Sequence, residues 1–156
     1  MSKCSLGNKV VGIYSLEAVR QKLRSGELAD NWVVSITDLA DDFIVSGRCR
    51  GILRVKFDDI QEAWLERKLA TAADIRRILD WCRDKDGIVI HCQAGASRSA
   101  AVAYLIECLQ TTPKEALGIL DTNQHSPNMH IVRLGAKILR NPEVAIEAER
   151  WRERNG

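Results

Sequence analysis

The sequence predicts an α/β fold, a single domain over residues 1–156 with a central mixed or parallel β-sheet flanked by helices. Three observations indicate this class. Short apolar runs typical of strands fill the first part of the chain, amphipathic runs typical of helices fill the later part, and one strand near the middle passes into a helix through a turn of small residues. A chain of 156 residues also fits one domain, because domains cluster at about 100–150 residues.

The first elements are short and mostly apolar. Val10 to Tyr14 has the composition of a strand, and Leu16 to Leu23 predicts a helix that a Ser-Gly pair ends. Trp32 to Ile36, "WVVSI", is rich in β-branched residues and predicts a buried strand. Ile52 to Phe57 alternates apolar and basic residues, which is the pattern of a strand with one face in water.

The later elements are mainly helices with recognisable first residues. Thr71 begins a helix with Asp74 three positions on, which is the spacing of a capping box. Gly87 to Ile90 is a short apolar strand, and a helix is expected from Ser99 to about Leu109. Capping residues or prolines predict the starts of three more helices, at Thr112, Asn128 and Pro142.

Composition excludes several classes of protein. Hydrophobic residues make up 46% and charged residues 28% of the chain, which is typical of a globular domain. The 23 basic residues are spread among 21 acidic ones, so no nucleic-acid partner is expected. No run of about 18 apolar residues predicts a membrane span, and the N-terminal sequence lacks the pattern of a secretory signal. We therefore expect a cytoplasmic protein without membrane association.

Cysteine and histidine spacing argues against a disulfide scaffold or a metal site. The five cysteines are an odd number without a CxxC pair, so we expect free thiols in a reducing compartment: Cys4, Cys49, Cys82, Cys92 and Cys108. His125 and His130 have no cysteine or acidic neighbours at metal-ligand spacing. We therefore expect neither a metal nor another cofactor. The sequence indicates no oligomeric state.

The segment "HCQAGASRS", His91 to Ser99, has the features of an anion site. Backbone amides of such a loop converge on one concave nest, and the following helix adds the positive end of its dipole. Gly95 permits the turn. Amides, dipole and Arg98 all favour the charged form of the Cys92 thiol, so the loop predicts a nucleophile facing a bound phosphate.

This segment resembles the HCxxGxxRS signature of the cysteine-dependent protein tyrosine phosphatases, in their small dual-specificity branch. The resemblance implies a protein tyrosine phosphatase-like fold and hydrolysis of a phosphomonoester through a phosphocysteine. Cys92 and Arg98, six positions apart, would be catalytic. The residues expected to bind phosphate are Gln93, Ala94, Gly95, Ala96, Ser97 and Arg98.

Family members also carry an acid about thirty positions upstream of the cysteine, which protonates the leaving oxygen. Asp59 lies 33 positions before Cys92 and follows a predicted strand. Asp58 is the rival for this role. We favour Asp59 because "DIQE", which begins at Asp59, resembles the local pattern at the acid of the small dual-specificity enzymes. An acid is required because alkoxide and phenoxide leave poorly without a proton.

Three further residues gain a role from the resemblance. His91 is expected to orient the loop without contacting substrate. The Ser99 hydroxyl would stabilise the departing thiolate, or it would act as the helix N-cap. Asn128, in "SPNMHIVRL", resembles the family asparagine that braces the loop. The family arginine before that asparagine is missing, because Asn123 and Gln124 stand in its place.

The resemblance favours a phosphorylated protein or peptide as substrate, with phosphotyrosine first and some dual specificity. The alternatives are a phosphoinositide, an RNA 5′ phosphate, a phosphate-binding module without turnover, or sulfur transfer of the rhodanese kind. Inositol-lipid enzymes of the family carry lysines in the loop, whereas "QAGAS" is neutral. Activity needs a thiolate and a protonated carboxyl together, so a bell-shaped pH profile with an optimum at roughly pH 5–6.5 is expected.

Overall fold

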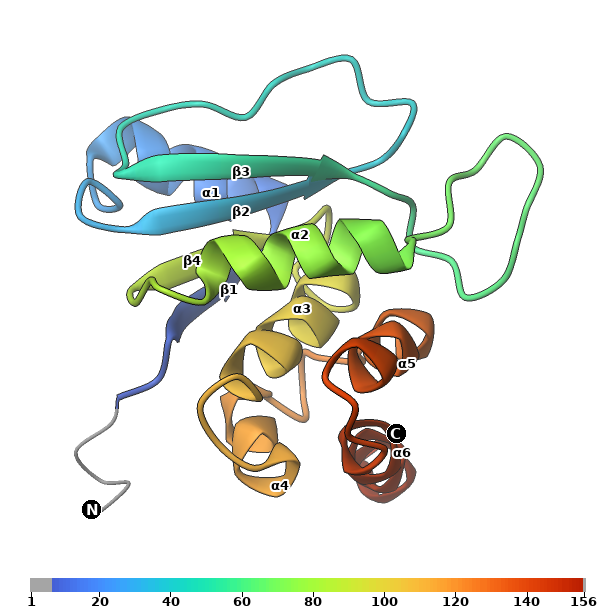
Figure 1. Ribbon diagram of the computed structural model, residues 1–156. Helices are drawn as coiled ribbons and strands as arrows, with labels where there is room; N and C mark the ends of the chain where they lie inside the picture. The colour runs from blue at the N-terminus through green and yellow to red at the C-terminus, as the bar shows by residue number, and fades with distance from the viewer. Residues whose placement is uncertain (1–6, 156) are drawn as a thin grey trace.

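The computed structural model describes residues 7–155 as a four-stranded sheet with helices on both faces (Figure 1). All neighbouring strands run parallel, and their order is β1-β4-β2-β3. The strands are β1 (Val10–Tyr14), β2 (Trp32–Thr37), β3 (Gly51–Lys56) and β4 (Ile88–His91). The predicted α/β class is therefore confirmed, with a fully parallel sheet.

The helices divide between the two faces of the sheet. Helix α1 (Leu16–Ser25) packs on one face, where Val19 and Leu23 join a small core with Val33 and Val89. The other helices build the larger core on the opposite face, where α5 contacts α2, α3 and α6. They are α2 (Ala72–Cys82), α3 (Arg98–Glu107), α4 (Pro113–Ala116), α5 (Met129–Ile138) and α6 (Glu143–Asn155).

Two of the predicted helix starts are confirmed by their capping contacts. Thr71 and Asp74 form the reciprocal capping box that begins α2, and the Asn128 side chain accepts from the Ile131 amide to begin α5. The helix after Thr112 is shorter than its sequence suggests. Helix α4 gives way to a 3₁₀ turn over Leu117–Ile119, where a glycine lowers helix propensity.

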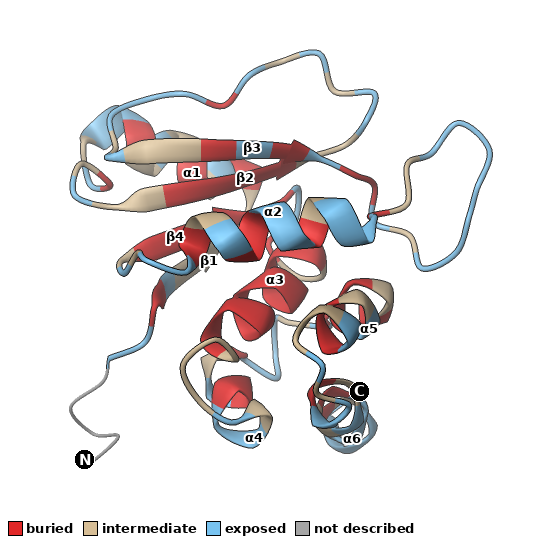
Figure 2. Ribbon diagram, in the orientation of Figure 1, coloured by how far each residue is buried: buried red, intermediate tan, exposed pale blue. Residues whose placement is uncertain are grey.

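Strand β4 and helix α3 form the most deeply buried unit of the molecule. All four residues of β4 and all ten of α3 are buried, as the continuous red of these elements shows (Figure 2). A helix that is apolar all round lies in the interior rather than at a surface. The loop that joins these two elements is consequently anchored at both ends in the core.

Among the described residues, every helix is too short or too polar to cross a bilayer.

Candidate active site

Three loops meet at the carboxyl edge of the sheet. Residues 92–98, the cysteine loop, follow β4, and residues 58–68, the aspartate loop, follow β3. The segment that begins at Asp38 follows β2, which lies between these two strands. Open parallel sheets bind ligands at this edge, because the connections leave the strands there with free polar groups.

The backbone of the cysteine loop turns its carbonyls outward. The carbonyl of Gln93 accepts from the Leu16 amide at 3.1 Å, and that of Ala96 accepts from the Ser126 amide at 2.9 Å. The Ser97 carbonyl accepts from the Asn128 amide at 3.1 Å. Within residues 7–155, the amides of residues 93–98 donate no hydrogen bond. These unpaired donors give the loop the character of an anion-binding nest.

Gly95 fits this turn for two reasons. Its φ of +73° lies in the left-handed region, which side chains with a Cβ rarely adopt. A Cβ at this position would also lie 2.6 Å from the carbonyl carbon of Tyr14 and 2.7 Å from the amide nitrogen of Ser15. The cysteine loop therefore lies directly against the junction of β1 and α1.

The Cys92 thiol lies at the base of the loop, beside a hydroxyl. Its Sγ is 3.1 Å from Ser99 Oγ, and the residue is 2% exposed. Ser99 lies inside α3, whose N-cap is Ser97, so the expectation that Ser99 caps the helix is wrong. Helix α3 begins one residue earlier than expected, at Arg98, which is itself buried.

The Arg98 guanidinium is fixed through one of its nitrogens. Nη1 donates to Asp38 Oδ1 at 2.6 Å and to the Phe57 carbonyl at 2.8 Å. The adjacent Nε is buried and, like Nη2, has no hydrogen-bond partner among residues 7–155. One edge of the planar fork thus keeps its donors for a ligand. Sequence reasoning missed Asp38, which no motif or spacing connects to Arg98.

His91 joins the loop to the interior of the sheet. Its Nε2 is 2.7 Å from Ser35 Oγ, and its Nδ1 is 3.2 Å from the Cys92 carbonyl. Since that carbonyl only accepts, Nδ1 carries the proton and Nε2 accepts from the serine hydroxyl. Burial lowers the pKa of His91 to about 4. The ring is therefore neutral near pH 7 and holds a single tautomer.

The two candidate acids have different surroundings. Asp58 is buried, and its Oδ2 accepts from the Lys68 amide at 2.6 Å, while its Oδ1 pairs with Arg67 Nη1 at 3.3 Å. Asp59 Oδ1 instead accepts from Ser97 Oγ at 2.8 Å and from Asn128 Nδ2 at 2.9 Å. Of these two side chains, only that of Asp59 forms a hydrogen bond with the cysteine loop among the described residues.

Asn128 links three segments at this point. Its amide nitrogen donates to Ser97, its Nδ2 donates to Asp59 and to the Ile60 carbonyl, and its Oδ1 caps α5. The side chain therefore connects both loops with the start of a helix. Within the described part of the chain, residues 123 and 124 make no side-chain hydrogen bond to either loop.

The other described cysteines, Cys49, Cys82 and Cys108, are free and lie outside the cysteine loop. Burial raises the pKa of Cys82 to about 12 and that of Cys108 to about 12, and it also raises the pKa of Cys49. Such thiols react slowly near neutrality. Cys4 lies outside the described residues.

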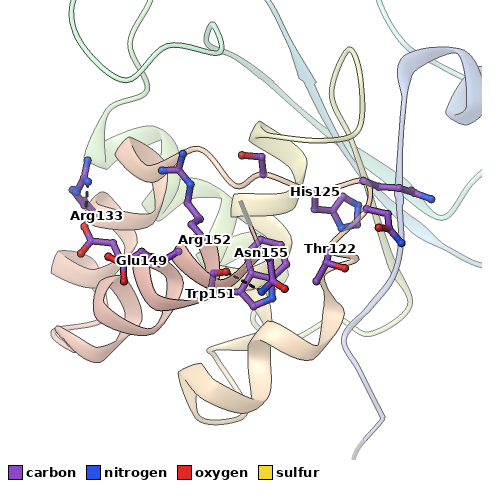
Figure 3. Close-up of a pocket in the computed structure, with 11 residues that line it drawn as sticks. Thr122, His125, Arg133, Glu149, Trp151, Arg152 and Asn155 are labelled. Atoms are coloured by element: carbon purple, nitrogen blue, oxygen red, sulfur yellow. Dashed lines mark hydrogen bonds and ion pairs between the residues drawn. The ribbon is translucent and has the colours of Figure 1, made fainter.

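A groove with a volume of about 590 Å³ lies outside the cysteine loop, between the segment before α5 and the end of α6 (Figure 3). Arg133 and Glu149 form an ion pair at 3.2 Å on its wall, and His125 lies opposite α6. The lining has charges of both signs and no thiol. The reactive groups gather at the cysteine loop instead.

Among residues 7–155, no group of three metal-ligating side chains occurs.

Comparison with known proteins identifies the family. Residues 31–134 match the model of the family described as dual specificity phosphatase, catalytic domain. The chain belongs to this family. It is therefore a cysteine-dependent phosphatase of the protein tyrosine phosphatase superfamily, and the matched segment contains the cysteine loop, the aspartate loop and Asn128. A search of curated proteins gives no significant match.

Solved structures of dual specificity phosphatases and related proteins share the fold. Human DUSP28 is similar with a TM-score of 0.60 and 17% identity over 92% of this chain and 96% of its own. PTPMT1 in complex with PI(5)P gives 0.56 and 16% over 90% and 94%. The human tyrosine phosphatase-like serine/threonine/tyrosine-interacting protein gives 0.55 and 12% over 78% and 87%.

Proposed function

We propose that residues 1–156 form one phosphatase domain that hydrolyses phosphorylated proteins, phosphotyrosine first and phosphoserine or phosphothreonine to a lesser extent, through a phosphocysteine. The observation that carries this proposal is the convergence of three groups on one loop. A thiol lies at its base, a guanidinium has one edge unpaired, and the Asp59 carboxylate is bonded to Ser97 of the same loop. Four described cysteines are unpaired, which supports a reducing, cytoplasmic location.

In the first step the Cys92 thiolate attacks phosphorus, and the bond from phosphorus to the leaving oxygen breaks. The amides of residues 93–98 and the Nε and Nη2 donors of Arg98 hold the three remaining oxygens. Asp59 gives its proton to the leaving oxygen. Because Oδ1 already accepts two hydrogen bonds, the transferred proton is held on Oδ2.

In the second step water attacks the phosphocysteine, and Asp59, now a carboxylate, accepts a proton from that water. The bond between sulfur and phosphorus breaks, and phosphate leaves. The thiolate that departs receives a hydrogen bond from Ser99 Oγ, which lies 3.1 Å from the sulfur. His91 orients the loop through the Cys92 carbonyl and makes no contact with the substrate.

A protein substrate is favoured over an inositol lipid by the loop itself. The segment "QAGAS" adds no positive charge to that of Arg98. When one phosphate of an inositol ring occupies the loop, a second phosphate on that ring would therefore find no further cation within the loop. PTPMT1, which shares the fold, has been solved with PI(5)P, and phosphoinositide is therefore the second candidate substrate.

The test compares substrates and one substitution. The wild-type protein is expected to hydrolyse p-nitrophenyl phosphate and phosphotyrosine peptides and to leave thiosulfate unchanged. Cys92→Ser should abolish turnover and still bind phosphate, because the nest and Arg98 remain. Cys49→Ser, which changes a half-buried thiol elsewhere, should retain activity. Full activity in Cys92→Ser, or turnover of thiosulfate alone, would overturn the proposal.

A further inference from the structure

A groove beside the cysteine loop runs along helix α1. It has a volume of about 450 Å³, and we call it the α1 groove. Gln93 of the cysteine loop contributes to its lining. The lining residues are Ser15, Leu16, Glu17, Arg20, Arg24 and Gln93. Because Gln93 neighbours the nucleophile, a substrate whose phosphate occupies the loop has this groove within reach.

Two arginines give the α1 groove its charge. Arg20 and Arg24 are four positions apart, so their side chains lie on the same face of the helix. Like charges at this spacing destabilise a helix. Within residues 7–155 neither guanidinium donates a hydrogen bond or pairs with a carboxylate. An anion bound between them would relieve the repulsion.

The Arg20 side chain is held in place rather than extended into solvent. Its guanidinium carbon lies 4.6 Å from the centre of the Phe43 ring, which comes from the connection between β2 and β3. Its charge also reaches the base of the cysteine loop, since Arg20 contributes to the low pKa of His91. A guanidinium fixed against a ring loses less freedom when it binds an anion than a free one does.

We propose that the α1 groove is a second anion subsite, in which Arg20 and Arg24 bind an acidic or phosphorylated residue that flanks the target phosphotyrosine of a peptide. This assignment rests on the proposed function of the cysteine loop and names part of its specificity. Glu17, which lines the same groove, opposes binding and limits the preference.

The length of the groove points to a peptide. From Leu16, whose amide bonds the cysteine loop, to Arg24 the helix rises about 12 Å. An extended peptide covers that length in about three to four residues. The acidic residue is therefore expected two to four positions from the phosphotyrosine. Arg20, one turn closer, would bind an acid at the nearer of these positions.

The test uses phosphotyrosine peptides with Glu or Gln at positions two, three and four on either side of the phosphotyrosine. For each position the kcat/KM of the Glu peptide is divided by that of the Gln peptide. The wild-type protein is expected to give a ratio of about five at one or more positions, rising at low salt. In the double variant Arg20→Gln, Arg24→Gln the ratio should fall to about one. In Glu17→Gln it should rise.

A charge-matched control separates this subsite from a general charge effect. The double variant Arg76→Gln, Arg77→Gln removes two positive charges from α2, on the opposite face of the sheet, and should leave the ratio at its wild-type value. A ratio of one in the wild-type protein, with peptides still hydrolysed, overturns the subsite but not the proposed function. Failure to hydrolyse any peptide overturns the proposed function. Arginine-dependent hydrolysis of phosphoinositide vesicles without a peptide preference overturns the peptide assignment.

Discussion

The cysteine loop and the aspartate loop lie at the same edge of the sheet, yet they are held in opposite ways. Cys92 and Arg98, at the two ends of the cysteine loop, are 2% and 4% exposed. Trp64 and Leu65, at the tip of the aspartate loop, are 66% and 86% exposed, and this loop projects from the molecule (Figure 2).

The aspartate loop is held near its two ends, through residues 58–60 and 67–68, while its tip is exposed. The Asp58 amide donates to the Lys68 carbonyl at 2.8 Å, and the Lys68 amide donates back to Asp58 Oδ2. This reciprocal pair closes the loop like the neck of an Ω-loop. The difference matches the roles that the proposed mechanism gives to the two loops. The phosphate, which is the same in every substrate, would bind the buried cysteine loop, whereas the leaving group, which varies, would lie beside the exposed aspartate loop.

Among substitutions that keep Cys92, Arg98 and Asp59 in place, the largest effect is expected from a methyl group added to the cysteine loop. Gly95→Ala places a Cβ against the backbone of Tyr14 and Ser15, so the loop must shift and its amides lose their alignment. Displacements of about 1 Å reduce rates about 100-fold, and here nucleophile and donors shift together. A loss of about 1,000-fold in kcat/KM for p-nitrophenyl phosphate is expected. Gly118→Ala, with open space around its Cβ, is the matched control and should be silent.

The second prediction concerns His91, which connects the cysteine loop to the core. Its unfolded pKa is near 6.5 and its folded pKa about 4, so only the unfolded state binds the proton between these values. Stability from His91 is therefore complete above pH 6.5 and falls by about 3 kcal/mol as the pH drops to 4.

Urea unfolding at pH 4 to 7 measures this dependence. The free energy of unfolding should change less steeply with pH in His91→Gln than in the wild-type protein. Burial also lowers the pKa of His125, so His125→Gln serves as the control for a histidine that does not contact the cysteine loop through its side chain. Equal slopes for the wild-type protein and His91→Gln would show that the ring takes up its proton without cost.

A third prediction distinguishes the two neighbouring aspartates. Asp59→Asn should lower kcat for phosphotyrosine about 100-fold, because its leaving oxygen needs a proton. The loss should be smaller with p-nitrophenyl phosphate, whose leaving group departs more easily. Asp58→Asn weakens the neck of the loop and should reduce stability without this dependence on the leaving group. The opposite pattern would make Asp58 the acid.

The smallest effect is expected at the tip of the aspartate loop. Trp64→Ala and Leu65→Ala remove side chains that are mostly in water, so the free energy of unfolding should change by less than about 0.5 kcal/mol. Trp151→Ala, in the core, should cost about 3 kcal/mol or more in the same urea titration. A large loss of unfolding free energy in Trp64→Ala or Leu65→Ala would mean that the tip of the aspartate loop is packed as firmly as the cysteine loop.

Local signals in the sequence predicted most elements and the main site, whereas contacts between distant segments were not predictable. The Thr71 cap follows from the three-residue spacing to Asp74, the Asn128 cap from a residue type that favours helix starts, and the cysteine loop from a single continuous motif. The contact between Asp38 and Arg98 joins residues 60 positions apart and depends on strand order, which periodicity does not contain. Asp58 and Asp59 are adjacent and chemically identical, so only the fold distinguishes the buried one from its neighbour.

The contact between Gly95 and the junction of β1 and α1 has a consequence for where the functional unit begins. The family match starts at residue 31, but the Tyr14 carbonyl accepts from the Cys92 amide and the Leu16 amide donates to the Gln93 carbonyl. A truncated chain starting at residue 31 would keep every signature residue and lose β1 and α1, whose junction contacts the cysteine loop. The boundary of a catalytic unit is thus drawn by what supports the chemistry, not by the span of its motifs.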